Sequence, residues 1–182
     1  MYGVGGLIER RTANHERALE VYFDTKFFEV AVQAGTALTI PETVTDIADE
    51  IELAIETVET TKNKFVNGVP RNMISVVMSP AYYGKLRNKI NQIFNSNDLG
   101  QVRNYEAGMF NNCRVYSSVN LPAGTDYVVM VDGAVAQPIR TSIYNPRPLE
   151  LSDAVAMGIF TYAGTTAVEP DLIFYAGEVV SQ

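Results

Sequence analysis

Apolar and polar positions recur with different periods along the chain, and these periods predict where helices and strands form. Between residues 43 and 67 the apolar positions fall three or four residues apart, which gathers them on one face of a helix. The next segment, Met73–Met78, is apolar almost without interruption and predicts a central strand covered on both faces. The helical stripe consists of Val44, Ile47, Ile51, Ile55, Val58, Lys62 and Phe65.

The ends of this long amphipathic helix carry signals of their own. Thr43 and Asp46 have the spacing of a capping box at its start, and Asn67-Gly68 is expected to end it. The acidic side chains precede the lysines along the helix, which is the order that the helix dipole favours. The acids are Asp46, Asp49, Glu50, Glu52, Glu56 and Glu59, and the lysines are Lys62 and Lys64.

Two more helices are expected around this block. Thr12 or Asn14 can cap a helix over residues 12–34, and Gly35 ends it. Ser79 can cap another helix whose first position is Pro80, where the missing N–H costs nothing. The apolar face of the earlier helix consists of Leu19, Tyr22, Phe23, Phe27, Val30, Ala31 and Ala34; that of the later helix consists of Leu86, Ile90, Ile93 and Phe94.

The last third of the chain is predicted to be rich in strands. Residues 113–119 alternate between apolar and polar, and residues 127–131 form a second apolar strand. Residues 134–137 are expected to be a short helical turn or a loop, and residues 101–112 irregular or a short turn of helix. Further strands are expected near residues 139–144, 154–162 and 172–180. Helices early and strands late predict an α+β protein in which strands from distant segments share one sheet.

Composition and charge narrow the possible classes. The 182 residues are 47% hydrophobic and 19% charged, enough to bury a core as one domain or two small interleaved ones. The formal net charge of −7 argues against a surface dedicated to nucleic acid. No apolar run approaches the ~20 residues that span a bilayer, and no secretory signal is visible. A single cysteine excludes an internal disulfide and fits a reducing compartment.

The candidates for chemistry are few, and each has an ordinary structural interpretation. His15 lies on the polar side of the first helix, and Cys113 is expected to be a small buried hydrophobic residue. One histidine and one cysteine cannot build a zinc cluster. The segment Gly3-Val4-Gly5-Gly6 lacks the preceding strand and later glycine of a dinucleotide site, and Arg10-Arg11 is too short for a nucleic-acid patch.

The acids of the long helix are expected to form a solvated face rather than a metal site, because no histidine joins them. We therefore expect that the protein is not an enzyme. No catalytic, cofactor-binding or metal-binding residue is predicted, and no cofactor.

The segment FVNGVPRNMISVVMSPAYYGKL, residues 65–86, resembles the heart of tailed-bacteriophage major capsid proteins. In that family a long helix ends in an N-x-P type of turn before a strand closing in S-P, and a helix carrying Y-x-x-L follows. Residues 115–122, VYSSVNLP, are similar to the family's V-Y-x-S-x-x-L-P segment. Residues 127–136 and 163–175 resemble its later strands, so the matches run in order over residues 40–176.

The resemblance implies the Hong Kong 97-type phage capsid fold, with a long spine helix, here the helix of residues 43–67, and peripheral and axial domains. It assigns residues 12–66 and 138–168 to the peripheral domain, and residues 67–137 and 169–182 to the axial domain. The family's N-terminal arm and extended loop are largely missing, so we expect an N-terminally truncated chain. Residues 1–11 are then a remnant of that loop, with Tyr2–Ile8 as the tail of its return strand.

The function that the resemblance implies is that of a structural coat protein, which self-assembles into the icosahedral head of a tailed phage or prophage around DNA. Its partners would be copies of itself, in hexamers and pentamers when full length, together with a scaffolding protein and a portal. No specific nucleic-acid recognition and no membrane contact are expected. The protein would be made in the host cytoplasm and located in the virion.

Two alternatives stay open at this point. An encapsulin-like compartment shell would have the same fold and a protein cargo. A small-molecule-binding α+β domain would need convergent polar residues in an apolar pocket, and the residue inventory does not offer them.

Overall fold

The computed structural model describes residues 4–93, 109–143, 147–148, 155–156 and 159–177. Three helices are present in these ranges: α1 (Val4–Ala34), α2 (Ile47–Thr60) and α3 (Pro80–Ile93). Two short 3₁₀ turns, Arg71–Met73 and Pro170–Leu172, each lead into a strand. All three helices lie in the first half of the chain, and strands make up most of the second half. This order is typical of an α+β protein.

A mixed sheet of six strands forms the centre of the molecule. Its order across the sheet is β1-β12-β5-β2-β4-β3. The innermost strands, β2 and β5, are antiparallel to each other, while β2 and β4 run parallel. The strands are β1 (Thr36–Ala37), β2 (Ile74–Met78), β3 (Met109–Phe110), β4 (Cys113–Ser117), β5 (Thr125–Val131) and β12 (Ile173–Gly177).

Helices cover both faces of this sheet. Ile74, Val76 and Met78 of β2 alternate with Ser75 and Val77, so the two sets point to opposite faces. On the first face lie α2 and α3: the ring of Tyr82 on α3 meets the buried ring of Tyr127, the register partner of Met78, with centroids 5.5 Å apart. On the second face lies the C-terminal part of α1. The prediction that β2 is buried on both sides is therefore confirmed.

The approach of α1 to the sheet explains why Gly35 follows it. A Cβ atom at Gly35 would lie 2.8 Å from the Ala31 carbonyl oxygen and 2.8 Å from Cγ2 of Ile173 in β12. Only glycine allows this spacing, and the helix ends at Ala34 as predicted.

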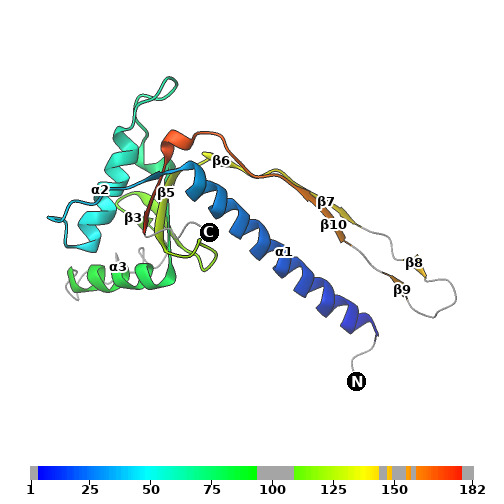
Figure 1. The fold of residues 1–182 in the computed structure, drawn as a ribbon. Helices are drawn as coiled ribbons and strands as arrows, with labels where there is room; N and C mark the ends of the chain where they lie inside the picture. The colour runs from blue at the N-terminus through cyan, green and yellow to red at the C-terminus, as the bar shows by residue number, and fades with distance from the viewer. Residues whose placement is uncertain (1–3, 94–108, 144–146, 149–154, 157–158, 178–182) are drawn as a thin grey trace.

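Two parts of the chain project from the sheet: α1 and a two-stranded ribbon (Figure 1). In the ribbon, β7 (Ile139–Ile143) pairs with β10 (Ile159–Ala163), and β8 (Arg147–Pro148) pairs with β9 (Val155–Ala156). Among the described residues no further strand pairs with this ribbon. At its base β6 (Val135–Ala136) pairs with β11 (Thr166–Ala167). Gln137 ties the base to α1, because its Nε2 donates to the Phe23 carbonyl oxygen at 2.9 Å.

The second helix is shorter than predicted and is not the longest described helix, which is α1. It starts at Ile47 because the Asp46 carboxylate accepts the Ala48 N–H at 3.1 Å, whereas Val44 lies in a preceding turn. The predicted Thr43 cap is therefore wrong. The second helix ends at Thr60 because residues 61–68 fold back on themselves, with a β-bridge between Lys62 and Asn67.

The first helix begins earlier than predicted. It starts at Val4 rather than at residue 12, so the strand expected at Tyr2–Ile8 is not formed by the described part of that segment. Residues 7–11 are Leu-Ile-Glu-Arg-Arg, without proline or a turn signal, and most of them favour helix. The capping signal at Thr12 and Asn14 does not interrupt such a run.

The other predicted elements have mixed outcomes. The third helix is confirmed from Pro80, and the Ser79 hydroxyl accepts the Tyr82 N–H at 3.3 Å. The predicted strands near residues 113–119, 127–131, 139–144 and 172–180 correspond to β4, β5, β7 and β12. Residues 134–137 contain β6 instead of a helical turn or loop. Phe94 and residues 101–108 lie outside the described residues.

Replacing Ile51 by alanine tests the core under α2. Ile51 is fully buried with Ile55 and Val58, so Ile51→Ala should lower the free energy of unfolding. A loss of ~2–5 kcal/mol in denaturant melts is expected for a buried large-to-small change. Glu56→Ala, at an exposed position on the same helix, is the control and should change stability by less than ~0.5 kcal/mol. A loss below ~1 kcal/mol for Ile51→Ala would contradict the packing of α2 on the sheet.

Candidate functional site

Cys113, a candidate from the sequence, is a buried structural residue. It lies in β4 with no exposed surface, and its Sγ donates to the Arg71 carbonyl oxygen at 3.3 Å. Burial raises the pKa of the thiol to about 11, which disfavours the reactive thiolate. The interpretation as a small buried hydrophobic residue is confirmed.

The acids of α2 hold the surrounding elements together by ion pairs. Arg71 reaches Glu52 through Nη1 at 2.5 Å and Glu59 through Nε at 2.9 Å, which fastens α2 to the turn before β2. These two carboxylates raise the pKa of the Arg71 guanidinium. Asp46 pairs with Lys89 of α3 at 2.6 Å, and this contact lowers the pKa of Asp46. The acids thus join α2 to its neighbours rather than forming only a solvated face.

Glu50 completes this set by accepting a hydrogen bond from the Tyr82 hydroxyl at 2.6 Å. Burial, and then Glu50, raise the pKa of Tyr82. The neighbouring Tyr127 is fully buried, and burial raises its pKa strongly as well. Both phenols therefore keep their protons and serve packing.

The remaining sequence candidates lie on α1. His15 and Arg11 are exposed there, and Gly5 and Gly6 are part of the helix rather than of a loop for a phosphate. In the described ranges no three His, Cys, Asp or Glu side chains are grouped so that they could hold a metal ion. No described helix is long and apolar enough to cross a membrane.

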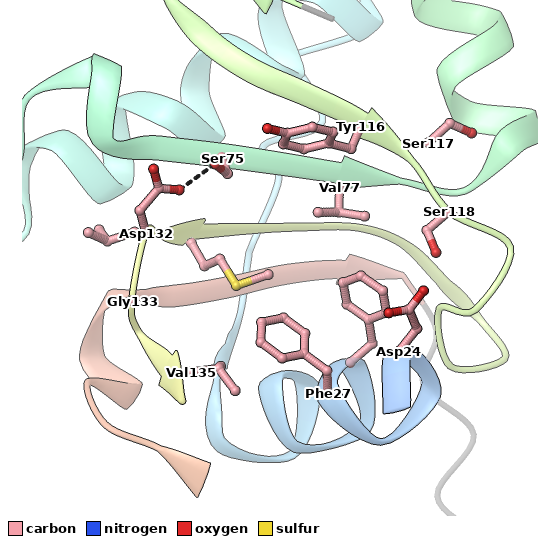
Figure 2. A pocket seen from close by; sticks show the side chains of 13 residues that line it. Asp24, Phe27, Ser75, Val77, Tyr116, Ser117, Ser118, Asp132, Gly133 and Val135 are labelled. Carbon is pink, nitrogen blue, oxygen red and sulfur yellow. Dashed lines mark hydrogen bonds between the residues drawn. The ribbon is translucent and has the colours of Figure 1, made fainter. Parts of the chain in front are cut away.

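A groove of about 360 Å³ lies between α1 and the second face of the sheet (Figure 2). Phe27 and Phe28 line it from α1, while Val77, Met130 and Val135 contribute apolar groups from β2, β5 and β6. The other lining residues are Asp24, Ser75, Tyr116, Ser117, Ser118, Val131, Asp132 and Gly133. The position of the groove follows from the packing, because α1 covers β12 and leaves the β2–β4 side of this face open.

Polar groups surround the groove and are held by hydrogen bonds. Asp132 accepts from the Ser75 hydroxyl at 2.6 Å and pairs with Arg114 at 3.2 Å. At the α1 side Asp24 accepts from Asn120 Nδ2 at 3.2 Å. The groove thus combines an apolar lining with a hydrogen-bonded polar border, which suits it to binding an apolar group.

Large apolar side chains are exposed at several places on the described surface. Phe65 is 83% exposed, although the sequence pattern assigned it to the buried stripe of the second helix. The position of Phe65 was missed because it depends on where α2 ends, and the groove was missed because it depends on how α1 crosses the sheet. The other exposed apolar residues are Val21, Tyr22, Met73, Met109, Tyr116, Val119, Ile139, Tyr162 and Val168.

No protein-family model matches the sequence, and no curated protein sequence matches it. Solved structures do match the fold. The capsid structure of the cyanophage P-SCSP1u aligns over 100% of this chain and 68% of its own, with a TM-score of 0.70 and 15% identity.

Two further phage structures give similar matches. A structure from Mycobacterium phage Che8 covers 92% of this chain and 62% of its own, with a TM-score of 0.68 and 21% identity. The mature capsid of bacteriophage PhiM1 covers 97% of this chain and 65% of its own, with a TM-score of 0.61 and 16% identity.

These identities establish a shared fold and nothing finer. The Hong Kong 97-type capsid fold expected from the sequence is therefore confirmed. The chain spans 62–68% of the length of these phage chains. None of the three matches favours the encapsulin-like alternative.

Thiol labelling tests the environment of Cys113. A pKa raised from its ordinary value to about 11 reduces the thiolate fraction roughly 100-fold, and burial restricts access further. Native protein should therefore react with a chromogenic disulfide reagent at least about 100-fold more slowly than protein unfolded in guanidinium. Val119→Cys, at an 80% exposed position in a Cys113→Ser background, should react at the unfolded rate. Rapid labelling of native Cys113 would contradict its placement in the core.

Proposed function

We propose that this chain is the major capsid protein, or the shell-forming part of it, of a tailed phage or prophage. The observation that carries the proposal is the likeness of 92–100% of the chain to phage structures, two of them described as capsids. The role is structural: copies of the chain associate into a closed shell around DNA, and no catalytic turnover takes place.

The projecting parts support this role on physical grounds. Between Glu9 and Glu20 every side chain of α1 is exposed except the half-buried Thr12 and Leu19. Most helical stability in proteins comes from packing against other elements, and isolated two-stranded ribbons are marginal in water. Both would be stabilised by contact with neighbouring copies, as in a shell.

The division into domains belongs to the same proposal. We assign the projecting part, with α1 and the ribbon, to the peripheral domain, and the six-stranded sheet with α3 to the axial domain. Because α2 contacts β5, β12, β2 and α3, it goes with the axial part. This moves the first proposed boundary from residue 66 to about residue 34.

The partners and location follow from the shell role. Besides copies of itself, the chain would meet a scaffolding protein during assembly and a portal at one vertex. It would be made in the cytoplasm of a bacterial host and end in the virion. Specific recognition of nucleic acid is not part of the proposal, since the net charge is −7.

Sedimentation velocity and negative-stain microscopy test the proposal. At physiological salt, which screens the net negative charge, the chain should be a monomer or small oligomer at low micromolar concentration and form larger species towards millimolar concentration. Rings or shells in the micrographs would support the capsid role directly. A chain that stays monomeric throughout this range, or that turns over a substrate, would overturn it.

A further inference from the structure

Phe65 is presented to solvent by a rigid turn, the tip loop of residues 61–68. The Asn63 side-chain oxygen accepts the backbone N–H groups of Phe65 at 2.9 Å and Val66 at 2.7 Å. Asn63 N–H donates to the Val66 carbonyl oxygen at 2.9 Å. Gly68, with φ +88°, closes the loop by donating to the Thr61 carbonyl oxygen at 3.2 Å. The backbone of the loop is thus held by hydrogen bonds and not by burial of the Phe65 ring.

Phe65 is 83% exposed, more than any other of the exposed large apolar side chains in the described residues. Lys64 lies over it with Nζ 5.6 Å from the ring centroid, and Lys62 is exposed on the same loop. Because hydrogen bonds already fix the loop backbone, burying the ring against a partner orders only its side chain, and aromatic residues are enriched in interfaces. The tip loop therefore has the properties of an interface anchor that carries positive charge.

The groove between α1 and the sheet has the complementary properties. Its volume of about 360 Å³ is at the low end for binding pockets and suits one ring rather than a large ligand. The exposed Tyr116 stands at its sheet side beside Val77, and Phe27 lies across the groove on α1 (Figure 2). Asp132 is neutralised by Arg114, which leaves the exposed Asp24 as the acidic group facing an incoming lysine.

We propose that Phe65 of one copy inserts into the groove of a second copy, with Lys62 or Lys64 beside Asp24. Within its own chain the Phe65 ring is exposed to solvent, so it does not fill the groove of the same copy. The proposal rests on the proposed function, since it names the contact by which copies associate. Because loop and groove are different surfaces, the contact is head-to-tail, the kind that forms closed rings when the rotation permits.

Two variants separate the two halves of this contact. Phe65→Ser removes the anchor, and Tyr116→Lys blocks the groove with a charge; both positions are exposed, so the fold should persist. Each variant alone should self-associate at least about 30-fold more weakly than the wild type in sedimentation equilibrium. Met109→Ser, at an exposed apolar residue of β3 outside both surfaces, is the control and should associate as the wild type does.

Mixing the variants tests whether loop and groove bind each other. The Phe65→Ser chain keeps its groove and the Tyr116→Lys chain keeps its loop. The mixture should form one-to-one pairs with the wild-type affinity and nothing larger. A charge exchange tests the lysine contact: Lys64→Glu and Asp24→Lys should each weaken association, and the chain that carries both should recover.

The outcomes distinguish this inference from the proposed function. If the wild type associates and Phe65→Ser or Tyr116→Lys associates equally well, the loop–groove contact is overturned while the capsid role stands. If both variants are weakened but their mixture forms no pairs, the two surfaces do not meet, and the inference is overturned as well. A wild type that stays monomeric overturns both.

Discussion

The burial of β2 on both faces is the constraint on which the other elements depend. Pairing with β4 on one edge and β5 on the other satisfies the backbone of β2, but its side chains leave water only where each face is covered. Helices α2 and α3 cover Ile74, Val76 and Met78, and α1 shields part of the face with Ser75 and Val77. The uncovered remainder of that second face is the groove.

This arrangement also explains the ion pairs around α2. The apolar side of α2 packs against the sheet, so the acidic groups of α2 lie along its border with α3 and with the turn before β2. There Arg71 and Lys89 meet Glu52, Glu59 and Asp46. Apolar burial supplies most of the stabilisation, and the partly exposed pairs fix how the helix is oriented on the sheet.

Much of the fold could be predicted from local patterns, and the failures share a physical origin. The strand at Met73–Met78, the start of α3 at Pro80 and the end of α1 before Gly35 each depend on signals within a few residues. The end of α2 depends on a side chain, that of Asn63, which folds the backbone into a turn. Apolar periodicity does not detect such a turn, so Phe65 was placed in the core instead of on the surface. The groove depends on the crossing of α1 over the sheet, which no short segment encodes.

The pairing of β1 with β12 has a consequence for the timing of folding. Thr36 lies opposite Phe174 and Ala37 opposite Tyr175, and β12 also forms the neighbour of β5. Contacts between such distant residues form slowly, and the central sheet cannot be completed until β12, residues 173–177, has left the ribosome. A nascent chain therefore lacks the finished sheet and the surfaces built on it. The groove between α1 and the sheet therefore forms only after β12 has been synthesised, although α1 itself is made first.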